Sequence, residues 1–112
     1  MKEHLRIAAI ADLHVKKTGQ ASLQPLFAAA SEQADVLLLC GDLTDYGQVE
    51  EAKILAKDIS AFLRIPSMGV LGNHDFESGK ADEVVKIIAG AGVTMLDGGS
   101  HEIEGVGFAG IK

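Results

Sequence analysis

The chain has 112 residues, of which 47% are hydrophobic and 23% are charged, a mixture that suits one modest globular domain. Its formal net charge of −6 argues against non-specific binding to nucleic acid or to an anionic membrane, because both require a basic face. The single cysteine, Cys40, excludes an intrachain disulfide, and its apolar neighbours predict a buried structural thiol. The apolar run before Asp12 is too short for a signal peptide or a membrane span, so we expect a cytoplasmic protein without a membrane partner.

Strands and helices are predicted to alternate through most of the chain. The predicted elements are, in order, a strand at 5–11, a helix from a Ser22 cap to about 33, a strand at 36–40, a helix at 48–64, a strand at 67–71 and a helix at 81–89. The strands are short apolar runs, and the helices carry apolar stripes at helical spacing. Such alternation predicts an α/β fold with a parallel sheet and right-handed crossovers.

Three short strands are predicted after the third helix, at 93–96, 101–103 and 106–109. The last two alternate and are joined by Glu104-Gly105, a plausible hairpin turn. The strand pattern continues to Lys112 with no closing helix, cap or polar tail. We therefore expect residues 1–112 to form a single domain that is truncated at its C-terminal side.

A polar cluster follows each of the first three predicted strands. The clusters are Asp12-Leu13-His14, Gly41-Asp42-Leu43-Thr44-Asp45 and Gly72-Asn73-His74-Asp75. In an open parallel sheet, ligands bind at the carboxyl ends of the strands. The clusters are therefore expected to meet at one rim, although they lie far apart in the sequence.

Four residues of these clusters are typical ligands of a divalent ion such as Mn, Fe or Zn. Asp12 and His14 are two residues apart, so in an extended stretch their side chains would point the same way. Asp42 follows a glycine, and its carboxylate could bridge two cations. Asn73 also follows a glycine and offers a neutral amide oxygen.

Two further residues have the chemistry of proton transfer. His74 is adjacent to Asn73 and points elsewhere, which leaves its imidazole free to transfer a proton. Asp45 could orient that imidazole with its carboxylate. Each cluster alone is compatible with an ordinary turn, but all three in this order, each at the end of a predicted strand, favour a functional site.

The three clusters resemble the N-terminal motifs of the calcineurin-like metallophosphoesterase superfamily, which are D-x-H, G-D-x-x-D and G-N-H-[DE]. The resemblance implies the N-terminal half of an αββα sandwich and a site for two divalent metal ions. Asp12 and His14 would bind the first ion, Asp42 would bridge both ions, and Asn73 would bind the second.

The resemblance also implies a reaction, the hydrolysis of a phosphoester by a hydroxide held between the two ions. His74 would serve as general acid or as charge stabiliser at the phosphate, with Asp45 as its partner. Tyr46 follows the second aspartate, where the Ser/Thr protein phosphatases of the superfamily have an arginine. This departure favours the bacterial-type phosphodiesterase and phosphatase branch, which acts on small phosphoesters.

The later family motifs, G-H and G-H-x-H, are absent from the sequence. Two six-coordinate ions need about ten donor atoms, more than the four predicted ligands supply. His101 lies in an alternating hairpin and reads as a surface residue, and His4 lies at the opposite end of the first strand from the rim. We therefore expect these residues alone to be inactive as an enzyme.

Two alternatives to this phosphoesterase stay open. The chain could be a metal-binding or interaction unit without catalysis. It could also belong with the DNA-repair nucleases, which share the three motifs, although the acidic balance and the lack of a basic stripe make that less attractive. Substrate identity, and the choice between monoester and diester, stay open.

Half of such a sandwich would leave one apolar face of its sheet uncovered. An uncovered apolar face favours association, so we predict that the chain self-associates or is poorly soluble. Sedimentation at high protein concentration tests this prediction, and a monodisperse monomer would count against it.

Overall fold

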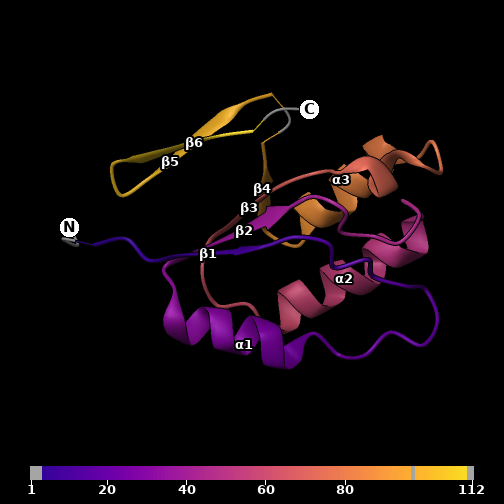
Figure 1. The fold of residues 1–112 in the computed structure, drawn as a ribbon, viewed down its shortest axis with the longest axis horizontal. Coiled ribbons are helices and arrows are strands. Elements are labelled where there is room, and N and C mark those ends of the chain that lie inside the picture. Colours follow the sequence, from indigo (N-terminus) through magenta and orange to yellow (C-terminus); the bar gives the residue numbers. More distant parts are fainter. Residues whose placement is uncertain (1–3, 97, 111–112) are drawn as a thin grey trace.

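The computed structural model describes residues 4–96 and 98–110 (Figure 1). Its elements are β1 (Ile7–Ile10), α1 (Gln24–Gln33), β2 (Val36–Cys40), α2 (Val49–Phe62), β3 (Ser67–Val70), the 3₁₀ helix η1 (Asn73–Phe76), α3 (Ala81–Gly90), β4 (Val93–Met95), β5 (Ser100–Ile103) and β6 (Val106–Ala109). The predicted alternation of strand and helix is confirmed. The predictions of a leaderless start and of an unfinished end refer to residues 1–3 and 111–112. These residues lie outside the described part of the chain.

The first four strands form a parallel sheet in the order β1-β2-β3-β4. Each crossover therefore steps in the same direction, and right-handed crossovers then place all three helices on one face. Figure 1 shows the helices on one side of this sheet and the β5–β6 hairpin on the other. The first of the three short strands predicted at the end joins β3 in parallel, and only β5 and β6 are antiparallel. Their turn is at Glu104 and Gly105, which have φ of 49° and 82°.

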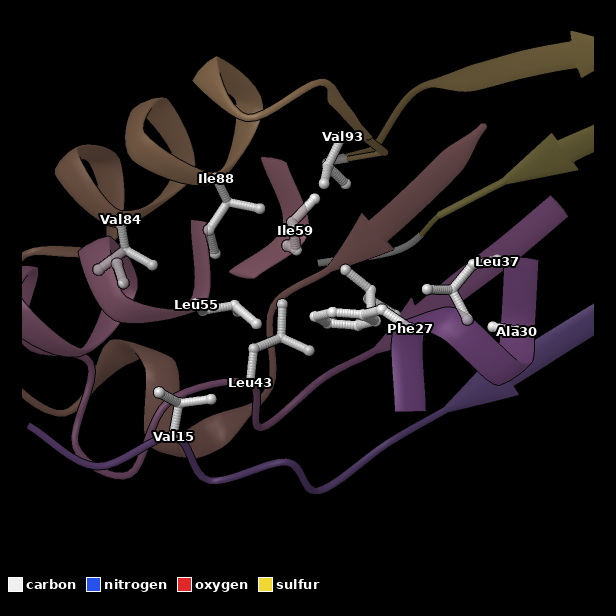
Figure 2. Close-up of a cluster of buried hydrophobic side chains, with 12 residues drawn as sticks. Val15, Phe27, Ala30, Leu37, Leu43, Leu55, Ile59, Val84, Ile88 and Val93 are labelled. Atoms are coloured by element: carbon white, nitrogen blue, oxygen red, sulfur yellow. The ribbon is translucent and has the colours of Figure 1, made fainter. Parts of the chain in front are cut away.

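The main core lies between the sheet and the helices (Figure 2). Its buried members are Val15, Phe27, Ala30, Leu37, Leu39, Leu43, Ala52, Leu55, Ile59, Val84, Ile88 and Val93. Leu37 and Leu39 of β2 point into this core because side chains alternate across a strand. Each fully buried aliphatic or aromatic side chain contributes about 1.5–3 kcal/mol relative to exposure. This core fixes the three strands whose carboxyl ends carry the polar clusters.

The opposite face of the sheet has a smaller apolar cluster, with Val36, Met68 and Leu96 buried. The hairpin covers it only in part, through Ile103 and Phe108. A hollow of about 140 Å³ stays open there, and it is lined by Leu38, Leu39, Cys40, Met68, Gly69, Val70, Leu96, Phe108 and Ala109. Self-association through this face stays a prediction.

Cys40 is exposed, so the predicted buried thiol is wrong. Cys40 follows Leu39, which points into the helix-side core, and its own side chain therefore points to the face that the helices do not cover. An apolar run indicates a buried strand but does not show which of its residues face the less covered side.

The start of α1 also differs from the prediction. The N-cap position is Leu23 rather than Ser22, whose hydroxyl oxygen instead accepts the Gln24 N–H at 3.1 Å. The Leu23 N–H donates to Asp58 Oδ2 in α2 at 2.9 Å. This bond ties the beginning of α1 to its neighbouring helix.

Candidate metal centre

The loops that follow β1 and β2 continue the pairing of the sheet beyond the strands. The Asp12 N–H donates to the Gly41 carbonyl at 3.1 Å, and the His14 N–H donates to the Asp42 carbonyl at 3.0 Å. The backbone of the first cluster is thus held directly against the second. The predicted meeting of the first two clusters at one rim follows from this pairing.

Asp12, His14 and Asp42 all have left-handed backbone, with φ of 58°, 47° and 49°. The extended stretch expected for Asp12 and His14 is therefore wrong. Left-handed backbone in a residue other than glycine costs about 1–2 kcal/mol and is concentrated at functional sites. Here it turns both side chains toward each other, so that His14 Nε2 lies 3.8 Å from Asp12 Oδ1.

The structure brings three of the four predicted metal ligands together. One ligand atom each from Asp12, His14 and Asp42 lies within 4.8 Å of the others. Ligands that share one zinc-like ion lie about 2.1 Å from it, so their separations reach about 4.2 Å. Two carboxylates and one imidazole at nearly this spacing fit a borderline divalent cation. Asn73, the fourth predicted ligand, is exposed at the start of η1.

The third loop is fixed to the second by a buried carboxylate, that of Asp75, which is 0% exposed. Its Oδ1 accepts the N–H and the hydroxyl of Thr44, at 2.8 and 2.6 Å. Its Oδ2 accepts the N–H groups of Leu43 and Gly72, at 3.1 and 2.9 Å. Four hydrogen bonds satisfy this carboxylate and lock the G-D-x-x-D loop against the G-N-H-D loop. No role was predicted for Asp75, although it is the last residue of the third motif.

His74 is held at the rim from two sides. Its backbone N–H donates to Asp42 Oδ1 at 2.9 Å. Its Nδ1 lies 2.8 Å from the carbonyl oxygen of Asp45. This carbonyl raises the pKa of His74, desolvation opposes the rise, and the negative charges of Asp42, Glu77 and Asp45 add to it. The edge of one imidazole faces the ring of the other, since the His14 and His74 centroids are 4.7 Å apart at 84°.

Asp45 contacts His74 through its main chain, whereas the prediction gave that contact to its carboxylate. The Asp45 carboxylate lies instead 3.8 Å from His14 Nδ1. Ligand atoms of His14, Asp45 and His74 form a second group within 4.8 Å, which overlaps the first at His14. Both groups therefore belong to one centre at the carboxyl rim.

The two glycines before Asp42 and Asn73 let the second and third loops approach closely. A Cβ atom on Gly72 would lie 2.4 Å from the Asp42 nitrogen and 2.5 Å from Asp42 Oδ1. A Cβ atom on Gly41, whose φ is 91°, would lie 3.2 Å from the Gly72 Cα. A larger residue at Gly72 would therefore require Asp42 to move, whereas a larger residue at Gly41 would crowd the Gly72 backbone and have to adopt a left-handed φ.

The remaining histidines are not at the rim. His101 is exposed on β5, in the hairpin on the other side of the sheet, and His4 is exposed before β1. Among the described residues, neither belongs to a group of candidate ligands.

The fold and the rim define a class, that of α/β proteins with a candidate divalent-metal site where parallel strands end. The family model for the calcineurin-like phosphoesterases matches residues 5–103. The chain belongs to the calcineurin-like phosphoesterase family, which confirms the predicted superfamily. Its α/β fold is consistent with the N-terminal half of such a domain. A comparison with curated proteins gives no match. Over the described residues, no helix is long and apolar enough to cross a membrane.

Proposed function

We propose that the chain carries part of the active site of a metal-dependent phosphoesterase that hydrolyses a small phosphoester, either a monoester or a diester. The observation that carries this proposal is the grouping of Asp12, His14 and Asp42 within 4.8 Å at the rim of a family domain. Carboxylates and an imidazole in this arrangement suit a cation that acts on phosphoryl oxygens. The absence of an arginine after Asp45 supports a small substrate rather than a phosphoprotein.

The proposed cofactor is a pair of divalent ions, Mn, Fe or Zn. Asp12 and His14 would hold the first ion, Asp42 would contact both, and Asn73 would hold the second. Two such ions supply an activated water and stabilise negative charge on the phosphoryl group. This assignment is supported by the neighbours of Asn73 in the chain, because the Gly72 backbone lies against Asp42 and the His74 N–H donates to Asp42 Oδ1.

His74 is proposed to act on the phosphate, as general acid or as charge stabiliser. The Asp45 carbonyl fixes the Nδ1 side of its ring at 2.8 Å, which favours a proton on that nitrogen. The Asp45 carbonyl, which is the largest cause of the raised pKa of His74, stabilises the protonated imidazolium, the form that can donate to a leaving oxygen or stabilise a phosphoryl oxygen. Asp45 thus acts as a positioning residue, through its carbonyl toward His74 and through its carboxylate toward His14.

The proposed centre needs ligands from outside these residues. Four side chains supply fewer donors than the ten or so that two six-coordinate ions need. We propose that a further segment or a second chain contributes the missing histidines. The residues described here would then bind metal weakly and show little hydrolysis by themselves.

Replacing Asp42 by asparagine tests the proposed function. The amide keeps the shape of the side chain but removes its negative charge. We therefore expect Mn²⁺ affinity to fall by about 100-fold, the upper end of the loss in affinity seen when a group that supports a metal site is removed. Calorimetric titration with Mn²⁺ measures the affinity, and Mn²⁺-dependent hydrolysis of bis-p-nitrophenyl phosphate measures the reaction.

Glu102→Gln is the matched control, because it removes one exposed carboxylate from β5 on the other side of the sheet. It should leave the Mn²⁺ affinity unchanged. Equal affinities of the Asp42→Asn variant and the parent chain would contradict the bridging role.

A further inference from the structure

A second hollow lies directly beside the candidate metal centre. It measures about 350 Å³ and is lined by Lys16, Lys17, Thr18, Asp45, Tyr46, Gln48 and Glu51. Asp45 belongs both to this wall and to the metal centre, where its carboxylate is 3.8 Å from His14. The hollow is at the lower end of the size range of small-molecule sites, about 300–1,000 Å³, and has room for one ring with its substituents. The proposed function does not use it.

Tyr46 lines the hollow, and its ring also lies near His74. Its side chain is 52% exposed, yet its backbone is fixed, because its N–H donates to Glu51 Oε1 at 2.9 Å. Its ring lies nearly parallel to the His74 imidazole, at 28°, with the centroids 6.5 Å apart. A half-exposed ring on a fixed backbone presents a face on which a planar group can stack.

The hollow also contains two cationic side chains, Lys16 and Lys17. Over the described part of the chain, neither ammonium group forms an ion pair. The Lys16 backbone is fixed because its N–H donates to Gln20 Oε1 at 3.0 Å. The chain as a whole has a net charge of −6. Two neighbouring lysines that form no ion pair within the described residues therefore favour the binding of an anionic group beside the rim.

The acidic residues of the same wall do not neutralise these lysines. Glu51 is 2% exposed, and its carboxylate accepts the N–H groups of Tyr46 and Gln48. The Asp45 carboxylate is close to His14 rather than to either lysine.

We propose that this hollow binds the leaving group of the substrate and selects phosphoesters whose leaving group contains a planar ring and a second anionic group. Tyr46 stacks on the ring, and Lys16 and Lys17 bind the second anion. The proposal rests on the proposed function, since it takes the metal centre as the place of the reacting phosphate. It makes these three residues determinants of specificity rather than catalytic residues.

Four phosphoesters separate the two features of the ligand. Glycerol 3-phosphate has neither feature, 3-phosphoglycerate has the second anion, phenyl phosphate has the ring, and 4-carboxyphenyl phosphate has both. Their affinities for the full chain are measured by calorimetry in the presence of Mn²⁺, a readout that needs no turnover. We expect 4-carboxyphenyl phosphate to bind about 5-fold tighter than phenyl phosphate, as one exposed ion pair allows. Because its ring can stack on Tyr46, 4-carboxyphenyl phosphate should also bind about 5-fold tighter than 3-phosphoglycerate.

Variants assign each advantage to its residues. Lys16→Gln/Lys17→Gln should remove the advantage of the carboxylate, and Tyr46→Leu should remove that of the ring. Lys53→Gln/Lys57→Gln is the matched control, because it removes the same charge from α2 in a separate hollow between α2 and α3. Tyr46 is the single tyrosine of a chain without tryptophan, so its ring resonances in NMR spectra with Mg²⁺ locate the bound ring.

The outcomes distinguish this proposal from the proposed function. Equal affinities for the four compounds, or equal losses in the control and in Lys16→Gln/Lys17→Gln, would overturn the leaving-group site alone. The same preferences measured without Mn²⁺ would support the leaving-group site and count against the metal centre as the place of the reacting phosphate. Failure of all four compounds to bind at saturating Mn²⁺ would reject both.

Discussion

Replacing Asp75 by asparagine should lower the free energy of unfolding by about 2–4 kcal/mol, the range for leaving buried hydrogen-bonding groups unpaired. The two oxygens of this buried carboxylate accept four hydrogen bonds, two each. An asparagine amide must place its NH₂ group on one side, against either the donors of Thr44 or the N–H groups of Leu43 and Gly72. The two donors on that side would then face the NH₂ group, which is itself a donor. Water cannot replace the lost acceptor oxygen there, because the site is inside the protein.

Urea unfolding measures this change as a lower midpoint with an unaltered slope. Asp82→Asn is the matched control, because Asp82 is exposed in the first turn of α3. The loss of its charge there should cost about 0.3–1 kcal/mol at most, through the helix dipole. A change at Asp75 no larger than that at Asp82 would show that the buried carboxylate does not hold the two loops together.

Replacing Gly72 by alanine should disrupt the candidate metal centre. The new Cβ would lie 2.4 Å from the Asp42 nitrogen and 2.5 Å from Asp42 Oδ1, far inside contact distance. Relief requires the second and third loops to separate, which moves Asp42 away from Asp12 and His14. We expect a loss of about 1–3 kcal/mol in stability, as overpacking causes, and at least a tenfold loss in Mn²⁺ affinity.

Thermal unfolding and calorimetric titration with Mn²⁺ measure the two effects of Gly72→Ala. Gly90→Ala supplies the control, since a Cβ atom at Gly90, the last residue of α3, would meet no atom within 4 Å. Alanine there should be neutral or stabilising, by up to about 1 kcal/mol. If the Gly72→Ala variant bound Mn²⁺ as tightly as the parent chain, the loops could separate without disturbing the candidate ligands.

The sequence predicted the sheet and the place of the site well, for a simple reason. The runs at β1, β2 and β3 are short and apolar, the helices between them carry apolar stripes, and a parallel arrangement brings every cluster to one rim. The meeting of the loops that carry Asp12, His14 and Asp42 follows from this topology. The orientation of their side chains depends in addition on left-handed backbone, which the sequence did not predict.

The details that sequence reasoning missed depend on contacts between distant segments. The left-handed φ of Asp12 and His14 arises where their loop pairs with the loop after β2, and residue type alone does not indicate it. The role of Asp75 depends on donors that lie 31 and 32 residues earlier in the chain. The contact of Asp45 with His74 uses a carbonyl, a group that every residue has, so no side-chain pattern could reveal it.

The unequal coverage of the two sheet faces was predicted in outline but not residue by residue. The strand at β2 is apolar throughout, so its sequence could not show that Cys40 points away from the helices. Only the strand order, which places all three crossovers on one face, decides this.

The strand register has a thermodynamic consequence for metal binding. The candidate ligands come from loops after different strands, and pairing such as Ile10 with Leu39 brings Asp12 level with the loop of Asp42. A slip of one residue would shift one strand by about 3.3 Å and turn its side chains to the other face, which would scatter the ligands. A cation held by these candidate ligands would therefore bind only the correctly registered sheet, and linkage would add its binding free energy to folding, by about 2.7 kcal/mol at a concentration one hundred times its Kd. Cation concentration would then act as a thermodynamic control on strand pairing in the whole sheet.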